Sequence, residues 1–307
     1  MKKWIIGICL MLIIIGLVIF GVSYYLFEYA ETPTNKEFIN SEPKSAELKK
    51  EYTWLKQVKK LNWQIKSEDN LKLKAIYVPA ESKTNKTIFV AHGFMGKKEE
   101  MVRFIHFYHD KGYNVLAPDA RAHGQSQGDY IGYGWLERKD NLQWLDKVIK
   151  YQGTDSKITL FGVSMGGATV MMLSGEKKLP SQVKAIIEDC GYTSVADELT
   201  YQLKQMYKLP KIPIIPIASL ISKVKAGYSF YEASSIKQLN HNKLPVLFIH
   251  GSDDKFVPTE MIYQNYAATR GPKEIFIAHG AKHATSFTKY KVEYEKKVTH
   301  FLKQYFN

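Results

Sequence analysis

Residues 158–167 read ITLFGVSMGG, an apolar run that ends in a serine enclosed by two glycines. The apolar half is typical of a buried strand, and the residues after the second glycine are typical of a helix. Ser164 therefore lies at a sharp turn between the two elements. Gly162 and Gly166 allow backbone segments to approach this turn more closely than side chains would permit. The stretch predicts a serine at a tight turn between the end of a central strand and the start of a helix.

Short apolar runs separated by helix-like stretches extend over most of the chain, and this pattern predicts a mostly parallel sheet with helices on both faces. The predicted strands are TIFVAHG (87–93), YNVLAPDA (113–120), KITLFG (157–162), VKAIIED (183–189), PVLFIHG (245–251) and KEIFIAHG (273–280). Residues 48–60 predict a helix, and residues 63–66 and 71–78 predict an antiparallel hairpin. Active sites in such sheets lie at the carboxyl ends of the strands.

The N-terminus is strongly apolar. From Trp4 to Phe27, 24 consecutive residues carry no charge, which is long enough for a helix to cross a membrane. We therefore expect a transmembrane anchor over 1–27, a polar tether over 28–47 and a folded domain over 48–307. Lysines before the apolar run and acids after it predict a cytoplasmic N-terminus and an extracytoplasmic domain. The alternative is a signal peptide cleaved near residues 21–23, which would release a secreted protein.

The composition argues against several other classes of function. Lys and Arg number 43 and Asp and Glu 30, but no basic patch interleaved with aromatic residues occurs, so we expect no nucleic-acid partner. The sequence has neither H-E-x-x-H nor C-x-x-C, so we predict no metal and no cofactor. Cys9 lies inside the apolar run and cannot pair with Cys190 in the folded domain. The oligomeric state is not predicted.

The turn around Ser164 resembles the G-x-S-x-G nucleophile elbow of the α/β-hydrolase superfamily, which includes esterases, lipases and serine aminopeptidases. The resemblance implies the α/β-hydrolase fold, with Ser164 as the nucleophile. It also implies that the backbone N–H of Met165 forms part of an oxyanion hole. A serine hydroxyl needs a base to take its proton and an acid to orient that base.

Two later segments are similar to the parts of this family that supply the acid and the base. Residues 245–258, PVLFIHGSDDKFVP, resemble H-G-x-x-D-x-x-V-P, which makes Asp254 the triad acid and leaves Asp253 as its rival. Residues 275–286, IFIAHGAKHATS, resemble the histidine loop after the last strand. There the resemblance favours His283 as the base, with His279 as the alternative.

Two earlier loops also resemble the family. VAHGFMG at 90–96 has the His-Gly-x form of the second oxyanion donor, which would be the backbone N–H of Phe94, while His92 is expected to pack beneath the site. DARAHGQSQG at 119–128 is similar to D-x-R-G-H-G-x-S and is expected to shape the floor of the site. Ala122 stands there in place of a glycine, so the backbone conformation at this position is left open.

About 55 residues separate the strand ending at Asp189 from the strand beginning at Pro245, far more than an ordinary connection needs. We expect a helical lid insertion over about 191–243. Its apolar, proline-containing part is expected to cover the acyl site. The four residues expected to contact substrate are Ile212, Ile214, Ile215 and Leu220. A surface that dips into the membrane and a buried helix pair without substrate contact are the alternatives.

Together these features predict a membrane-anchored serine hydrolase that cleaves carboxylic esters through a Ser-His-Asp triad and an acyl-enzyme intermediate. The expected substrate is a small-molecule or lipid ester. A peptidase or acyltransferase using the same triad is the first alternative. A catalytically silent binding module on the same fold is the second.

Overall fold

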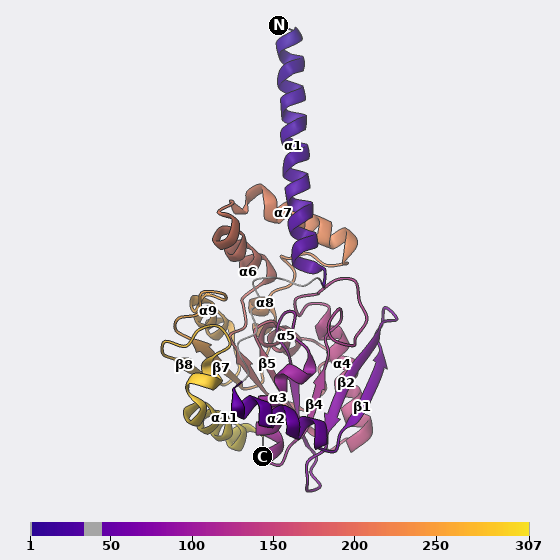
Figure 1. Ribbon diagram of the computed structural model, residues 1–307, viewed down its shortest axis with the longest axis vertical. Helices are drawn as coiled ribbons and strands as arrows, with labels where there is room; N and C mark the ends of the chain where they lie inside the picture. The colour runs from indigo at the N-terminus through magenta and orange to yellow at the C-terminus, as the bar shows by residue number, and fades with distance from the viewer. Residues whose placement is uncertain (1, 34–44, 307) are drawn as a thin grey trace.

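The structure is a computed structural model, and it describes residues 2–33 and 45–306. At its centre is an eight-stranded sheet in the order β1-β2-β4-β3-β5-β6-β7-β8 (Figure 1). The strands are β1 (Leu61–Lys66), β2 (Lys72–Val78), β3 (Lys86–Ala91), β4 (Asn114–Pro118), β5 (Lys157–Val163), β6 (Val183–Asp189), β7 (Val246–Gly251) and β8 (Lys273–Ala278). The strands from β3 to β8 pair in parallel, and β1 and β2 form the predicted antiparallel hairpin. The predicted fold class is confirmed.

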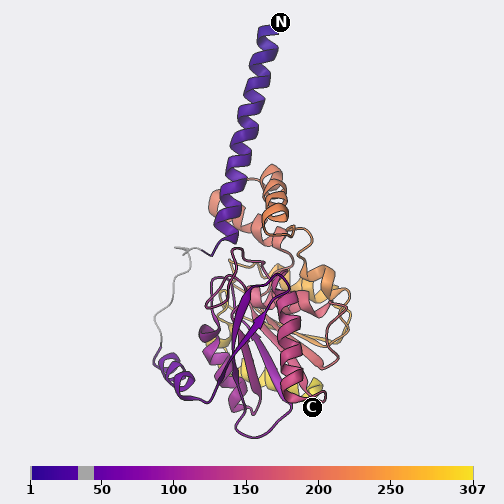
Figure 2. The same ribbon diagram turned by 90° about the vertical axis from the view of Figure 1, so that its right-hand side faces the viewer.

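Helices cover both faces of the sheet (Figures 1 and 2). Apart from the N-terminal helix, the helices outside the region between β6 and β7 are α2 (Ala46–Gln57), the 3-10 turn η1 (Lys98–Met101), α3 (Val102–Asp110), α4 (Glu137–Gln152), α5 (Met165–Ser174), α9 (Glu260–Ala268), α10 (Ser286–Lys289) and α11 (Lys291–Tyr305). The side chain of Ser45 caps α2 by accepting a hydrogen bond from the backbone N–H of Leu48 at 3.1 Å. The described domain therefore begins with an ordinary capped helix.

Alternation along the strands explains why the sheet is covered on both faces. Ile76 and Val78 of β2 pack with α3 and α11, whereas Ala75 and Tyr77 pack on the opposite face with α4 and α5. Successive side chains of a strand point to opposite faces, so a strand buried on both sides is apolar at nearly every position. One edge of the sheet can therefore hold a site, because the loops there follow the carboxyl ends of strands β3, β5, β6, β7 and β8.

A helical segment between β6 and β7, which we call the insertion (residues 191–243), lies over that edge. It contains α6 (Val195–Gln202), the π-helical turn η2 (Leu203–Tyr207), α7 (Lys211–Lys225) and α8 (Ser235–Leu239). Its apolar side chains form a third core cluster with residues of the 130–136 loop and of α5. This cluster places the insertion directly above the serine turn.

The N-terminal helix α1 (Lys2–Glu31) projects from the side of the domain that carries the insertion (Figures 1 and 2). Of the described residues, it is the one helix long and apolar enough to cross a membrane. It includes residues 28–31, which were expected to belong to the tether. The physical reason is that Glu28 pairs with Lys225 at 2.7 Å and Glu31 is fully buried against the insertion. Residues 34–44 of the expected tether lie outside the described residues.

Candidate active site

The turn between β5 and α5 gives Ser164 an unusual backbone conformation, with φ 57° and ψ −119°. Residues other than glycine rarely adopt this conformation, which costs about 1–3 kcal/mol. The two flanking glycines make the turn possible. A Cβ on Gly162 would lie 2.1 Å from the backbone oxygen of Gly166, and a Cβ on Gly166 would lie 2.2 Å from that of Ala91. The close approach inferred from the sequence is present at both glycines.

Two hydrogen bonds connect three residues that lie on separate loops. Nε2 of His283 is 2.8 Å from Oγ of Ser164, and Nδ1 of His283 is 2.7 Å from Oδ2 of Asp254. Ser164 follows β5, Asp254 follows β7 and His283 follows β8. The structure thus brings together the three residues predicted from separate segments. With Nδ1–H donating to the carboxylate, Nε2 is the acceptor for the serine hydroxyl.

The carboxylate of Asp254 is buried and fully hydrogen-bonded. Its Oδ1 accepts the backbone N–H groups of Phe256 and Val257, both at 2.9 Å, and its Oδ2 also lies 3.2 Å from Nε2 of His250. Burial by itself raises the pKa of Asp254, but the hydrogen bonds from His250 and His283 outweigh it and hold the pKa well below its usual range. Asp254 is therefore ionised at neutral pH.

The two rival residues lie at the surface. Asp253 is exposed, and its Oδ1 accepts a hydrogen bond from Ser252 at 3.1 Å. His279 is also exposed, and its backbone oxygen accepts a hydrogen bond from Tyr290. In the structure Asp254 and His283, rather than these neighbours, share a chain of hydrogen bonds with Ser164.

The turn after β3 lies against Ser164. A Cβ on Gly93 would be 3.4 Å from Cβ of Ser164, and the next residue, Phe94, lines the same cavity as Ser164 and Met165. His92 supports the turn from below, because its Nε2 accepts the backbone N–H of Ala120 at 2.9 Å. Burial, followed by the nearby His123, lowers the pKa of His92 to about 4, so its ring is neutral. This agrees with the packing role expected for His92.

The loop at 119–128 packs against the turn after β3, because Nε2 of His123 accepts the backbone N–H of Met95 at 3.1 Å, but none of the residues that line the cavity at Ser164 comes from this loop. The side chain of Lys98 lies 2.5 Å from the carboxylate of Asp119, and both side chains are almost completely buried. Ala122, where the family has a glycine, adopts φ 58°. The left-handed backbone that a glycine would favour is therefore kept here by an alanine.

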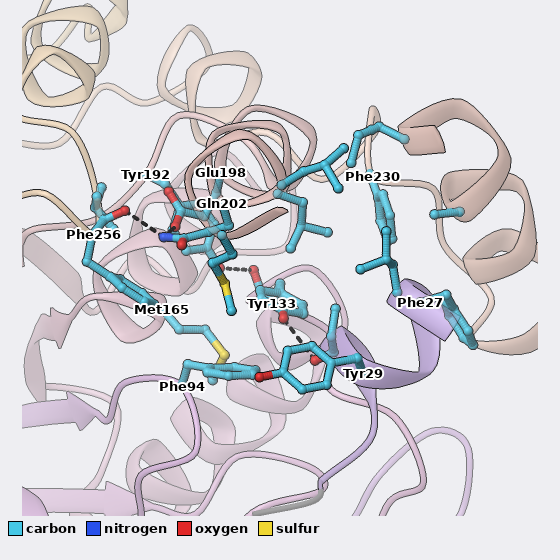
Figure 3. A pocket seen from close by; sticks show the side chains of 18 of the residues that line it. Phe27, Tyr29, Phe94, Tyr133, Met165, Tyr192, Glu198, Gln202, Phe230 and Phe256 are labelled. Carbon is cyan, nitrogen blue, oxygen red and sulfur yellow. Dashed lines mark hydrogen bonds between the residues drawn. The ribbon is translucent and has the colours of Figure 1, made fainter. Parts of the chain in front are cut away.

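An apolar cavity extends from Ser164 and Met165 into the insertion (Figure 3). The empty space in and around it, open solvent at its mouth included, is about 870 Å³. Two of the four predicted contact residues, Ile214 and Ile215, line the cavity, whereas Ile212 and Leu220 are 71% and 65% exposed. For Leu220 the difference follows from helical periodicity, since α7 turns only one of its faces toward the cavity. Ile212 has a non-helical backbone, with φ −100° and ψ 130°, and precedes the regular part of α7.

Several cavity residues were not identified from the sequence. Leu26, Phe27, Tyr29 and Ala30 come from the end of α1, and Glu198 comes from α6. The α1 residues lie at the end of the apolar run or in the expected tether, so no local pattern marks them as part of a pocket. His250 belongs to the recognised motif, but only the fold reveals its contact with the carboxylate of Asp254.

Among the described residues, one group has an arrangement compatible with a metal ion. Ligand atoms of Cys190, Asp254 and His283 all lie within 4.8 Å of one another. However, burial raises the pKa of the Cys190 thiol well above its ordinary value, which opposes the thiolate that a metal requires. Asp254 and His283 are moreover hydrogen-bonded to each other at 2.7 Å. The group has the chemistry of a proton-transfer site.

Comparisons with known proteins agree with this fold. Residues 82–223 match the family model described as serine aminopeptidase, S33. The chain is 32% identical to the uncharacterized protein YqkD of Bacillus subtilis (strain 168), over 80% of each chain. It is also 25% identical to the esterase Pf2001 of Pyrococcus furiosus, with a TM-score of 0.64 over 82% of this chain and 93% of that one. The acylaminoacyl peptidase of Pyrococcus horikoshii shares the fold, at 18% identity and a TM-score of 0.59 over 82% of this chain and 43% of that one.

Proposed function

Because this chain belongs to the α/β-hydrolase superfamily, we propose that it is a membrane-anchored carboxylesterase that uses Ser164, His283 and Asp254 as its catalytic triad. The observation that carries the proposal is the pair of hydrogen bonds from His283, at 2.8 Å to Ser164 and 2.7 Å to Asp254. These bonds orient a base toward a hydroxyl and an ionised acid toward that base. Acyl transfer requires this arrangement.

In the proposed mechanism, Oγ of Ser164 attacks the ester carbonyl carbon while Nε2 of His283 takes the hydroxyl proton. The negative oxygen that forms is held by the backbone N–H groups of Phe94 and Met165. His283 then gives its proton to the departing alcohol, which leaves an acyl group on Ser164. A water molecule, activated by His283, releases the acid and restores the serine. Asp254 stabilises the imidazolium in both halves of the reaction.

The choice of an ester is supported by the cavity and by one relative. The cavity is lined mainly by apolar and aromatic side chains, which suit an acyl chain. Pf2001, at 25% identity, is an esterase. Ile214 and Ile215 line the cavity and are assigned to the acyl chain.

Cleavage of an amide next to a free amine is a second candidate, which Glu198 favours. This side chain lines the cavity, is 4% exposed and has one carboxyl oxygen without a hydrogen-bond partner among the described residues. Burial raises the pKa of Glu198 to about 8, so this carboxyl group is protonated at neutral pH. An ammonium group in the cavity would favour the ionised form.

The anchor is proposed to remain attached. Its last turns, including Phe27 and Glu31, are buried against the insertion, so cleavage near residues 21–23 would leave a folded stub but no membrane span. We assign the N-terminus to the cytoplasm and the catalytic domain to the opposite side, on the basis of the lysines that precede the apolar run. Protease treatment of intact cells that leaves the domain undigested, while digesting a surface marker, would contradict this topology.

The experiment that tests the activity uses the full-length protein in detergent. A fluorophosphonate should label wild-type Ser164 and should not label Ser164→Ala, and p-nitrophenyl butyrate hydrolysis should be lost with the label. Cys190→Ser is a matched control, because Cys190 is the other buried nucleophile beside His283, and it should keep the label. Labelling that persists in Ser164→Ala would refute the assignment of Ser164 as the nucleophile.

A comparison of substrates separates the two candidate functions. We expect kcat/KM for p-nitrophenyl butyrate to exceed that for leucine p-nitroanilide by at least about a hundredfold. The opposite preference, together with loss of anilide cleavage in Glu198→Gln, would favour the second candidate.

A further inference from the structure

The end of the apolar helix α1 forms part of the wall of the catalytic cavity. Leu26, Phe27 and Ala30 line the same space as Ser164, and Figure 3 shows the Tyr29 side chain of α1 pointing toward Phe94, another residue of the cavity wall. Phe27 is completely buried and belongs to the same apolar cluster as Ile214. A helix expected to serve as an anchor thus also encloses the substrate space.

Polar contacts hold α1 in this position. Oε1 of the buried Glu31 accepts hydrogen bonds from the hydroxyl groups of Tyr228 at 2.7 Å and Ser222 at 3.0 Å. The backbone N–H of Ile131 donates to the carbonyl of Glu31 at 2.8 Å, and the hydroxyl of Tyr133 donates to that of Ala30 at 2.9 Å. Buried hydrogen bonds of this kind fix geometry, so the junction is a built part of the fold.

The burial pattern along α1 indicates how deep the cavity lies relative to a bilayer. From Trp4 to Gly21 nearly every side chain is exposed, and burial against the domain begins at Val22. These 18 exposed-face residues extend about 27 Å, close to the roughly 30 Å of a hydrocarbon core. Phe27 lies about 9 Å beyond Gly21 and therefore about 6 Å beyond a core of roughly 30 Å, at the depth of the lipid headgroups.

The insertion beside α1 has a surface suited to that depth (Figures 1 and 2). Ile212, Leu220 and Val224 on α7 are between 65% and 79% exposed. Exposed Lys211 begins the same helix, and exposed Lys208 lies just before it. Exposed apolar side chains next to lysines are typical of segments that lie in the surface of an anionic membrane.

We propose that the cavity receives one acyl chain of a glycerolipid ester taken from the bilayer that holds α1, and that Leu26, Phe27 and Ala30 form one wall of this acyl site. The inference rests on the proposed esterase function and names its substrate class. Ser164 lines the cavity, so the ester carbonyl of a bound lipid would meet the catalytic residues there. The outer part of the chain lies between α1 and the insertion.

The first test changes the α1 wall. In full-length protein, Leu26→Trp should fill part of the cavity and so disfavour long acyl chains. The ratio of kcat/KM for p-nitrophenyl octanoate to kcat/KM for p-nitrophenyl acetate should fall by at least about tenfold, which is equivalent to losing about two buried methylene groups. Leu17→Trp is the matched control, since it is the same substitution on the same helix at a residue 66% exposed. It should leave the ratio within about twofold of the wild type.

Leu26→Ala gives a second readout in case the larger side chain prevents folding. It should widen the cavity and raise the dodecanoate-to-octanoate ratio by about threefold or more. If wild-type Ser164 reacts with the fluorophosphonate but both Leu26 variants keep the wild-type ratios, α1 is not a wall of the acyl site. If wild-type Ser164 does not react, the proposed esterase function itself fails.

The second test concerns the source of the lipid. In the first arrangement, wild-type protein is reconstituted into vesicles of dioleoylphosphatidylglycerol whose oleoyl chains are radiolabelled. In the second, the protein is reconstituted into unlabelled vesicles, which are then mixed with labelled vesicles that contain no protein. Oleate release should be at least about tenfold faster when protein and labelled lipid share a bilayer, and Ser164→Ala should release none. Equal rates in the two arrangements, or no release from the shared bilayer, would overturn the bilayer as the source.

Discussion

Nε2 of His283 lies 2.8 Å from Oγ of Ser164, although 119 residues separate them along the chain. The strands that precede them, β5 and β8, are separated in the sheet by β6 and β7. The loop after β8 therefore reaches back across two strand ends to meet the serine. Asp254 holds the imidazole in that position through a 2.7 Å hydrogen bond. The hydrogen-bonded chain can persist only while the whole edge of the sheet is intact.

Substitutions should show that the hydrogen-bonded residues, and not their neighbours in sequence, are needed for activity. We expect His283→Ala and Asp254→Asn each to lower kcat for p-nitrophenyl butyrate by about a thousandfold or more. The exposed neighbours provide matched controls, and His279→Ala and Asp253→Asn should keep at least about half of the activity. Equal losses in a residue and its neighbour would show that general damage to the loop, rather than loss of proton transfer, limits the rate.

The serine turn should tolerate no side chain at Gly166. Gly166→Ala places a Cβ 2.2 Å from the backbone oxygen of Ala91, so the turn must separate from β3. We expect a loss of more than about 3 kcal/mol in the free energy of unfolding. Gly112→Ala is the control, because Gly112 has φ 82° but no atom within 4 Å of the position that a Cβ would take, and it should cost only about 1–2 kcal/mol. If urea unfolding gives comparable losses of unfolding free energy for Gly166→Ala and Gly112→Ala, close packing at Gly166 is not the cause of the destabilisation.

The buried pair of Lys98 and Asp119 should be important for stability. Asp119→Asn leaves the Lys98 ammonium buried without its charged partner, 2.5 Å away in the wild type. Breaking such a pair typically costs about 3–5 kcal/mol. Lys98 also contacts Glu99, whose side chain is 39% exposed. Glu99→Gln should therefore change the unfolding free energy by less than about 1 kcal/mol, and a larger effect than that of Asp119→Asn would contradict the assignment.

Glu188 at the end of β6 should make stability depend on pH. Burial raises the pKa of this fully buried carboxyl group to about 8, whereas its ordinary value is 4.5. The unfolded chain releases the proton near pH 4.5 and the folded chain keeps it to about pH 8. The stabilising contribution is therefore complete below pH 4.5 and is lost as the pH rises toward 8, at up to about 1.4 kcal/mol per pH unit.

Glu188→Gln removes this titration, so the melting temperature of the wild type should fall relative to that of the variant between pH 5 and pH 8. Glu81→Gln, at an exposed loop position, is the control and should follow the wild type across the same range. Parallel melting curves for wild type and Glu188→Gln would show that Glu188 is ionised in the folded chain at neutral pH.

Much of this protein was predictable because the relevant signals are local. The glycines around Ser164 indicate a turn that only small residues permit, and the apolar runs have the lengths and spacing of strands in a parallel sheet. The turn and the strands depend on neighbours within a few residues, for which backbone sterics and side-chain periodicity are sufficient. The choice of Asp254 and His283 came instead from the resemblance of their segments to the α/β-hydrolase motifs.

Only the tertiary structure decided which residues enclose the cavity. Ile214 and Leu220 are both apolar residues of one helix, yet Ile214 is 6% exposed and Leu220 is 65% exposed, because the body of the domain lies on one side of α7. From the sequence, Glu31 is likewise expected to be a tether residue. In the structure Ser222, 191 positions later, donates a hydrogen bond to it. Contacts between segments so far apart depend on how the whole chain packs. Local sequence determines which elements form, and packing among distant elements determines which of their faces become the site.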